Sequence, residues 1–203
     1  MAYITCDLAI SMDGFSSGLN QRLESPFGDG PVDMLHKWMF ETADENAEEI
    51  AAIVAADAFI MGRNMFSPGR GDWDPGWKGW WGDDPPYHKP VFVLTHHERD
   101  DLPMEGGTTF HFVTGGAEEA YKRAVEVTGD GTISIAGGAT TVNQFLRAGL
   151  IDELRLHIAP VTVGAGDRLF AGVPPLHFKQ VSARAASLVT HITYVRGEAG
   201  SPG

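Results

Sequence analysis

Short apolar segments alternate with amphipathic segments along most of this chain. Six apolar runs have the length of buried strands, and they span residues 3–10, 58–61, 90–95, 110–113, 133–136 and 153–159. Between them apolar residues recur at helical spacing, which predicts helices at 47–55, at 117–127, up to Ala148, and briefly from Asn64. Residues 178–185 and 188–195 resemble a closing antiparallel hairpin. This order predicts an α/β fold, a three-layer α/β/α sandwich whose mostly parallel sheet has an antiparallel C-terminal edge.

Two long segments, 11–36 and 69–89, are rich in Gly, Asp and Pro and lack this periodicity. Long structureless segments within a compact domain are usually functional, so we expect both to be flaps over a site. The second holds Trp73 and three tryptophans that we expect to contact a flat or bulky apolar substrate, namely Trp77, Trp80 and Trp81. The alternative is that these tryptophans only cover the core or a dimer contact.

The composition limits the classes of partner. The 203 residues suffice for one domain, which we place at residues 1–196, followed by a disordered tail at 197–203. A net charge of −12 argues against a nucleic-acid or anionic membrane partner, and no apolar run is long enough to span a bilayer. The only cysteine, Cys6, precludes an intrachain disulfide and fits a cytoplasmic protein. In so acidic a chain, a polyanionic ligand requires cations concentrated at one place.

The segment from Thr132 to Arg147 reads as a buried strand, a glycine pair and an amphipathic helix. At such a junction, backbone N–H groups and the positive end of the helix dipole point to one place, which suits a phosphate. Gly137 and Gly138 allow an anion to approach the backbone, and Thr140 adds a hydroxyl donor. The alternative is an ordinary strand-to-helix turn.

Three other strand ends carry residues suited to a ligand. Ala9 and Ile10 precede Asp13 and Gly14, Gly62 and Arg63 follow the strand at 58–61, and the strand at 90–95 leads into His96 and Arg99. Ligands of open α/β sheets bind at the carboxyl ends of strands. Each feature also has a plain explanation, as a turn, a surface arginine or a solvated basic turn. One strand end with anion-binding residues is common, but three of them together favour a dinucleotide, whose several phosphates would use them all.

These segments, in this order, resemble the dihydrofolate-reductase-like superfamily, and most closely the reductase domain of bifunctional riboflavin biosynthesis proteins and its stand-alone relatives. The resemblance covers residues 3–196. It is most specific in the glycine pair and its helix, the Asp-Glu-Leu strand from Asp152, the Ala-Pro-Val turn from Ala159, and the Gly-rich loop that ends in Leu169 and Phe170. Ser11-Met-Asp-Gly14 and Gly62-Arg63 also match, whereas Ala165 inside the Gly-rich loop departs from the pattern.

The resemblance implies NADPH as hydride donor and a homodimer. By this analogy Ala9 and Ile10 flank the nicotinamide, and the remaining cofactor contacts fall at three strand ends. The phosphate–ribose side is assigned to Gly62, Arg63, Asn64 and Met65, the adenosine end to Leu94, Thr95 and His96, and the pyrophosphate to Ala136, Gly137, Gly138, Ala139 and Thr140.

The substrate is less well defined. Dihydrofolate reductases hold the pteridine with an acidic residue early in the first helix, but residues 16–36 replace that region here, so folate reduction is not expected. Reduction of C=O needs a proton, whereas an iminium carbon needs none; Asp13, His157 and water are the candidate donors. His157 lies on the strand face opposite Leu154 and Leu156, toward the cleft, an interface, or a purely structural site.

We therefore expect an NADPH-dependent reductase of a C=N or C=O bond in a small or medium organic substrate, with secondary metabolism as one setting. No set of residues with metal-ligand spacing is present, so no metal is expected. Three alternatives remain open: a non-catalytic NADP(H) sensor, a riboflavin-pathway-like sugar–pyrimidine reductase, and a dimeric scaffold without a ligand.

Overall fold

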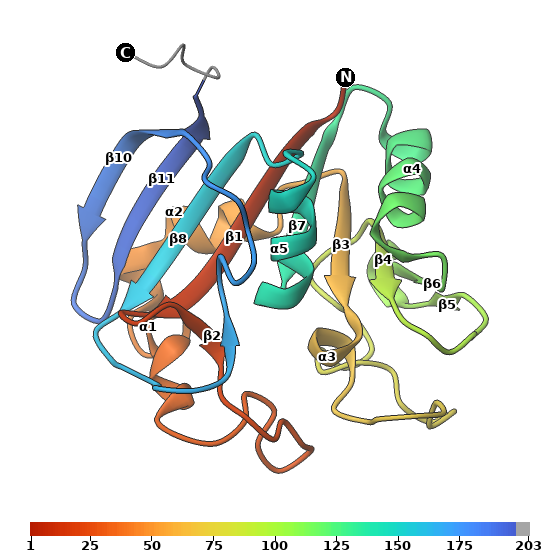
Figure 1. The fold of residues 1–203 in the computed structure, drawn as a ribbon. Helices are drawn as coiled ribbons and strands as arrows, with labels where there is room; N and C mark the ends of the chain where they lie inside the picture. Colours follow the sequence, from red (N-terminus) through yellow and green to blue (C-terminus); the bar gives the residue numbers. More distant parts are fainter. Residues whose placement is uncertain (198–203) are drawn as a thin grey trace.

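The computed structural model describes residues 1–197, and its centre is a nine-stranded sheet with helices on both faces (Figure 1). The sheet has the order β10-β11-β8-β1-β7-β3-β4-β6-β5. Its strands are β1 Tyr3–Ser11, β3 Ala58–Gly62, β4 Pro90–Leu94, β5 Leu102–Pro103, β6 Thr109–Val113, β7 Thr132–Gly137, β8 Glu153–Ala159, β10 Phe178–Ala185 and β11 Thr190–Arg196. A second, two-stranded sheet pairs β2 Phe15–Ser17 with β9 Asp167–Arg168.

The helices form the two outer layers. Those within the described residues are α1 Lys37–Phe40, α2 Ala47–Ile53, α3 Arg63–Phe66, α4 Gly116–Thr128 and α5 Ala139–Arg147, with short 3₁₀ turns at Val32–Leu35, Ala43–Asn46 and Glu105–Gly107. Helices α4 and α5 lie in front of the sheet in Figure 1, whereas α1 and α2 lie behind it. The predicted three-layer α/β/α sandwich is confirmed.

Six neighbouring strands, from β8 to β6 in the sheet order, run parallel, so their carboxyl ends lie along one edge. Strand β11 pairs antiparallel with β8, and β10 with β11, which is the predicted antiparallel C-terminal edge. Strand β1 pairs with β7 only from Tyr3 to Thr5, but it pairs with β8 as far as Ser11. The sheet therefore opens between β1 and β7 toward its carboxyl edge.

Alternation along the strands divides the interior into two main cores. Ile4, Cys6 and Leu8 of β1 point to the face covered by α4 and α5, and they pack with Phe145 and other buried residues there. On the other face, Phe59 of β3 belongs to a second core, which contains residues of β4, β6 and α3. The intervening residues of β1, such as Asp7 and Ala9, face the layer of α1 and α2.

The two segments expected to be unstructured are only partly so. Residues 11–36 contain β2 and the 3₁₀ turn at Val32–Leu35, and α1 follows directly. Elements of three or four residues are too short to show a period, which explains why sequence patterning missed them. The second segment, 69–89, contains no helix or strand. Of the tail predicted at 197–203, all but Gly197 lies outside the described residues, and the Gly197 amide donates to the His177 carbonyl at 3.0 Å.

His36, between the 3₁₀ turn at Val32–Leu35 and α1, is enclosed in the back layer. Its ring stacks on Phe27 with 4.3 Å between the ring centroids. Within residues 1–197 its Nδ1 atom has no hydrogen-bond partner. Burial, and secondarily the neighbouring His157, lower the pKa of His36 to about 4. The folded protein therefore holds this ring neutral where an unfolded chain would protonate it.

A histidine with a lowered pKa makes the folded state less stable as the pH falls. Below the ordinary histidine pKa, the unfolded chain binds a proton that folded His36 rejects, so stability is lost progressively down to about pH 4. We expect His36 alone to lower the free energy of unfolding by about 3 kcal/mol between pH 7 and pH 4. Urea unfolding measures the free energy of unfolding at both pH values. The difference between pH 7 and pH 4 should be smaller in His36→Phe than in the unmodified protein, and it should be unchanged in His177→Gln, an exposed control. An unchanged pH dependence in His36→Phe would contradict the assignment.

Candidate active site

The opening between β1 and β7 lies at the centre of the carboxyl edge. Ala9 and Ile10 lie on the β1 side, and Gly137 lies at the end of β7 on the other. Gly62 ends β3, the next strand, where Met61 is in register with Gly137. The fold thus brings together Ala9, Ile10, Gly62 and Gly137, four residues that sequence analysis took from three separate segments.

At two of these glycines a side chain would clash or would strain the backbone. A Cβ on Gly62 would lie 2.5 Å from the Thr141 Oγ1 atom in the first turn of α5. Gly137 has φ +126°, a conformation that L side chains rarely adopt, and it joins Gly138 through a cis peptide bond. The end of β3 and the start of α5 are therefore in direct contact, and the two predicted phosphate segments form one continuous surface.

The N-terminus of α5 already holds a negative charge supplied by the chain itself. The backbone N–H of Thr140 donates to the Asp167 Oδ2 atom at 3.1 Å, and the Thr140 hydroxyl donates to the other carboxylate oxygen. The N–H of Ala139 donates to the Ser16 hydroxyl at 3.2 Å. The prediction that this helix end favours an anion agrees with the contact to Asp167. Sequence analysis missed Asp167 and Ser16 because they reach α5 from the distant β9 and β2.

A second group of residues, beyond β3, supplies positive charge. The guanidinium carbon of Arg63 lies 4.0 Å from the centre of the Trp73 ring, and that of Arg99 lies 5.3 Å from the same ring. Both arginines have a buried nitrogen, Nε in Arg63 and Nη1 in Arg99, with no hydrogen-bond partner among the described residues. Burial, and to a lesser extent the nearby Arg70, lower the pKa of Arg63. Two partly desolvated cations with free donors are a suitable setting for a phosphate.

Other predicted residues of this region are more ordinary. Thr95 is buried, and its hydroxyl accepts from the His97 backbone N–H at 3.1 Å, whereas His96 is exposed. Asn64 accepts a hydrogen bond from Arg70 at 2.8 Å. Leu94 and Met65 are partly buried and pack against the two cores. These residues lie around Arg63 at the ends of β3 and β4, and their part in cofactor binding stays a prediction.

The tryptophan-rich segment 69–89 packs on the side of the sheet away from β1. Trp73, Trp77 and Trp81 contact the second core, which contains residues of β3, β4, β6 and α3. The indole of Trp77 donates to the Phe66 carbonyl at 2.8 Å, and Trp80 lies edge-on to Trp77 with 4.7 Å between ring centroids. In this conformation the segment covers core, as the alternative interpretation proposed, and not the opening beside Ala9. Substrate contact by Trp77, Trp80 and Trp81 stays a prediction.

Asp13 fastens one loop to another. Its carboxylate accepts from the Ser11 hydroxyl at 2.5 Å and from the backbone N–H groups of Val163 and Gly164 at 3.0 and 2.7 Å. These hydrogen bonds, led by the one from Ser11, lower the pKa of Asp13 to about 2. A carboxyl group with such a pKa is ionised at neutral pH and has no proton to donate. Asp13 is therefore unsuited to the proton-donor role predicted for it and instead ties β1 to the loop that carries Asp167.

His157, the other predicted proton donor, is buried between the sheet and the back layer. It is 2% exposed, and its ring lies 4.8 Å from that of Trp38. Its Nδ1 atom is 2.8 Å from the His191 Nδ1, and its Nε2 atom is 3.5 Å from an Asp7 carboxylate oxygen. His157 pairs in register with Ala9, so it is next to the opening but does not face open solvent.

Two features are absent from residues 1–197. No cluster of three or more His, Cys, Asp or Glu side chains is arranged to hold a metal ion. Among the same residues, no helix has the length and apolar content needed to cross a membrane.

Comparisons with known proteins agree with this architecture. An uncharacterized protein of Bacillus subtilis, YyaP, is 28% identical over 197 residues, which cover 94% of this chain and 93% of that protein. The structure of a putative riboflavin biosynthesis protein from Shewanella sp. PV-4 is similar with a TM-score of 0.63 at 24% identity, covering 98% of this chain and all of that one. Dihydrofolate reductase from Enterococcus faecalis, solved with NADP(H), gives 0.58 at 16% identity, with 97% of each chain covered.

The structural neighbours are less than 25% identical and so establish the fold alone. They confirm a dihydrofolate-reductase-like α/β architecture. Family membership rests on sequence, because the sequence pattern of the RibD C-terminal domain family matches residues 2–192, nearly the whole chain. The chain therefore belongs to the RibD C-terminal domain family.

Proposed function

We propose that this protein is an NADPH-dependent reductase that transfers hydride to a C=N or C=O bond of a small or medium organic substrate. The observation that carries the proposal is the convergence of Gly62, Arg63 and Gly137 with the start of α5 at the opening between β1 and β7. Membership of a family of riboflavin-pathway reductase domains, and the NADP(H) bound by a similarly folded dihydrofolate reductase, support it.

The residues present fit this cofactor. Because Gly62 has no side chain, the end of β3 can lie against Thr141 in the first turn of α5, and Arg63 and Arg99 have buried N–H groups without partners in the described part of the chain. Arg63, with Thr95 and His96, would hold the 2′-phosphate, and Gly137, Gly138, Ala139 and Thr140 would hold the pyrophosphate. When bound, NADPH would supply the hydride. Ala9 and Ile10, 8% and 6% exposed, would provide an apolar wall that excludes water and orients the reacting ring.

The nature of the substrate separates the alternatives. A sugar–pyrimidine reductase of the riboflavin type is favoured by the family match and by the riboflavin-related names of the structural neighbours. A substrate from secondary metabolism would have to be bulkier and more apolar, so that it engages the segment 69–89. A non-catalytic sensor would bind NADPH but would reduce no substrate with it. A panel of ribosylaminopyrimidines, ketones and cyclic imines, followed by loss of NADPH absorbance, distinguishes the three.

We expect NADPH to bind more tightly than NADH because Arg63 can form a charge-assisted contact with the 2′-phosphate. Loss of such a contact costs about 1.5–3 kcal/mol, or roughly ten- to a hundredfold in affinity. Calorimetry should therefore show Arg63→Gln losing this factor for NADPH while its affinity for NADH stays near that of the unmodified protein. Arg22→Gln, which removes an exposed arginine paired with Asp29, is the control. Equal affinities of the unmodified protein for both cofactors would refute the 2′-phosphate site.

Asp167 is expected to compete with the cofactor for the N-terminus of α5. Its carboxylate accepts from both the N–H and the hydroxyl of Thr140, the same donors assigned to the pyrophosphate. Asp167→Asn keeps the shape and removes the charge, so NADPH should bind more tightly, by about tenfold for one removed charge repulsion. Asp130→Asn, on the exposed turn between α4 and β7, should leave the affinity unchanged. Weaker binding in Asp167→Asn would mean that this carboxylate supports the cofactor site instead.

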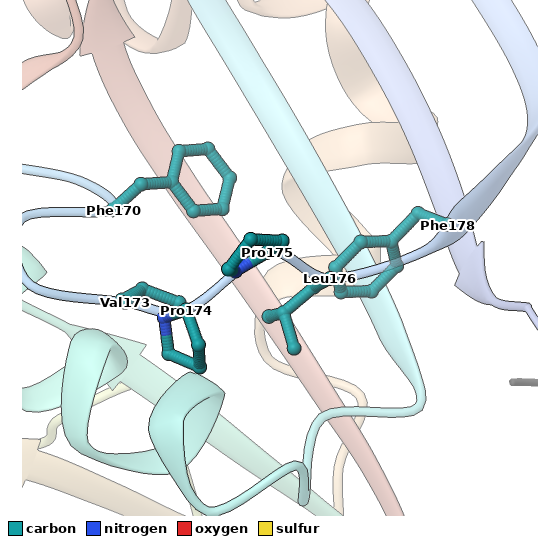
Figure 2. Close-up of a pocket in the computed structure, with 6 residues that line it drawn as sticks. All are labelled: Phe170, Val173, Pro174, Pro175, Leu176 and Phe178. Carbon is teal, nitrogen blue, oxygen red and sulfur yellow. The ribbon is translucent and has the colours of Figure 1, made fainter.

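We also propose a homodimer, formed through an apolar groove of about 380 Å³ that precedes β10 (Figure 2). Phe170 and Leu176, 46% and 38% exposed, lie beside two prolines there, in front of the sheet. Val161 and Val163, which form another apolar stretch, pack against the 3₁₀ turn at Val32–Leu35 and are not part of this groove. Light scattering should give twice the chain mass for the unmodified protein. Leu176→Asp should give the mass of a single chain, whereas the control Val127→Asp on α4 should still give twice that mass. A monomer at micromolar concentration would contradict this.

A further inference from the structure

A chain of buried polar side chains connects the back layer to the opening in the sheet. Its members are Asp7 on β1, His157 on β8, His191 on β11 and Asn46 at the start of α2, and each is less than 8% exposed. Burying so many polar groups is unfavourable unless their donors and acceptors are matched. The hydrogen-bond partners of Asn46, at one end of this hydrogen-bonded series, therefore fix where the protons lie at Asp7, at the other end.

The orientation of Asn46 is set by its surroundings. Its Nδ2 atom donates to the backbone carbonyls of Trp38 and Thr42, at 3.2 and 2.8 Å, which can only accept. Its Oδ1 atom accepts from Arg184 Nη2 at 2.9 Å, and an arginine can only donate. The His191 Nε2 atom, 2.9 Å from the same Oδ1, must therefore carry a hydrogen and donate it.

The next proton follows from this one. Burial, together with the neighbouring His157, lowers the pKa of His191 to about 4, so this ring is neutral at pH 7. With its hydrogen on Nε2, its Nδ1 atom holds a lone pair and can only accept. The 2.8 Å contact between the two Nδ1 atoms therefore requires His157 to donate from Nδ1.

The remaining nitrogen of His157 then faces a carboxylate. Its Nε2 atom lies 3.5 Å from Asp7 Oδ1, within ion-pair range but without hydrogen-bond geometry. Arg155 Nη1 lies 3.0 Å from the other oxygen of Asp7 and forms an ion pair with it. A neutral His157 would turn a lone pair toward this anion in a buried site. We infer that His157 is instead a buried imidazolium, with hydrogens on both ring nitrogens, and that the His157–Asp7 pair stores the proton used in the reduction.

With a positive charge on His157, each carboxylate that forms an ion pair around the ring has a cation to compensate it. Asp7 and Glu153 are compensated by Arg155 and His157, while Glu49 is compensated by Arg184. The titratable or charged groups that face the pair from the surrounding elements are Asp7, His36, Glu48, Glu49, Glu153, Arg155, Arg184 and His191. Desolvation lowers the pKa of both His36 and His191, and the neighbouring His157 lowers both further, so both rings are neutral.

A cavity gives the pair a route to solvent. It has a volume of about 180 Å³, and its wall includes Asp7 and His157 at the buried end and the exposed Glu48 and Ser182 at the other. On the sheet, Ala9 is the register partner of His157, so the pair and the expected nicotinamide wall are neighbours. Proton donation rests on the proposed function: as a C–H bond forms at the carbonyl carbon and the C=O π bond breaks, the oxygen would gain the proton that the His157–Asp7 pair gives up, and His157, left neutral, would regain a proton through the cavity.

The charge on His157 can be measured without any substrate. Nitrogen-15 NMR of histidine-labelled protein separates imidazolium from the two neutral tautomers, and His157→Gln and His191→Gln assign the signals. At pH 7.5 we expect both His157 nitrogens to be protonated, and His191 to be neutral with its hydrogen on Nε2. A neutral His157 at this pH would overturn the inference, whether or not the protein turns over a substrate.

Asp7→Asn tests what the charge does. It removes the anion, so the His157 signal should become that of a neutral ring, while the exposed His177 stays unchanged. For a carbonyl substrate, kcat at pH 7.5 should fall by about a hundredfold, as expected for loss of a general acid, with NADPH affinity unchanged. If the ring becomes neutral but kcat does not change, the pair is structural and the proton-store role is wrong. NADPH binding in the same samples separates that outcome from failure of the proposed function.

Discussion

The structure depends on the way β1 divides its hydrogen bonds between two neighbours. Near its start β1 pairs with both β7 and β8, but beyond Thr5 only the pairing with β8 continues. Because β7 stays in register with β3, the sheet splits into two parallel groups whose carboxyl ends diverge. Ligands of open α/β sheets occupy such positions. The split puts an apolar wall, Ala9 and Ile10, on one side and glycine-lined backbone, Gly137 and Gly62, on the other.

Carboxylates of this acidic chain already satisfy much of the backbone around the opening. Asp13 accepts from two N–H groups of the loop after β8, and Asp167, farther along that loop, reaches the N-terminus of α5. Both contacts are favourable, because an anion stabilises free N–H groups and the end of a helix. They also link the two sides of the opening. A pyrophosphate at the N-terminus of α5, as the proposed function requires, would displace the Asp167 carboxylate, so cofactor binding would be coupled to the position of this loop.

Much of the fold follows from local pattern, and the site only in part. The parallel strands and the antiparallel edge were predictable because runs such as 58–61 and 153–159 are long enough to show their period. The convergence of Gly62 with the glycine pair followed from the rule that strand ends share an edge. Asp167 was not predictable, since its contact to Thr140 depends on how a distant loop returns. The tryptophans of 69–89 are ambiguous for a similar reason, because no local pattern tells whether an aromatic side chain covers core or ligand.

His157 shows where sequence reasoning stops and geometry adds information. Alternation placed it on the strand face opposite Leu154 and Leu156, as the structure has it. Its protonation depends on Asn46 and Arg184, which lie far away in the sequence. An apolar set of side chains would have filled the same space at lower cost, because buried ionic groups contribute little net stability compared with well-packed hydrophobic ones. A polar chain that fixes a proton beside Ala9 is therefore better explained by chemistry at the opening than by the stability of the fold.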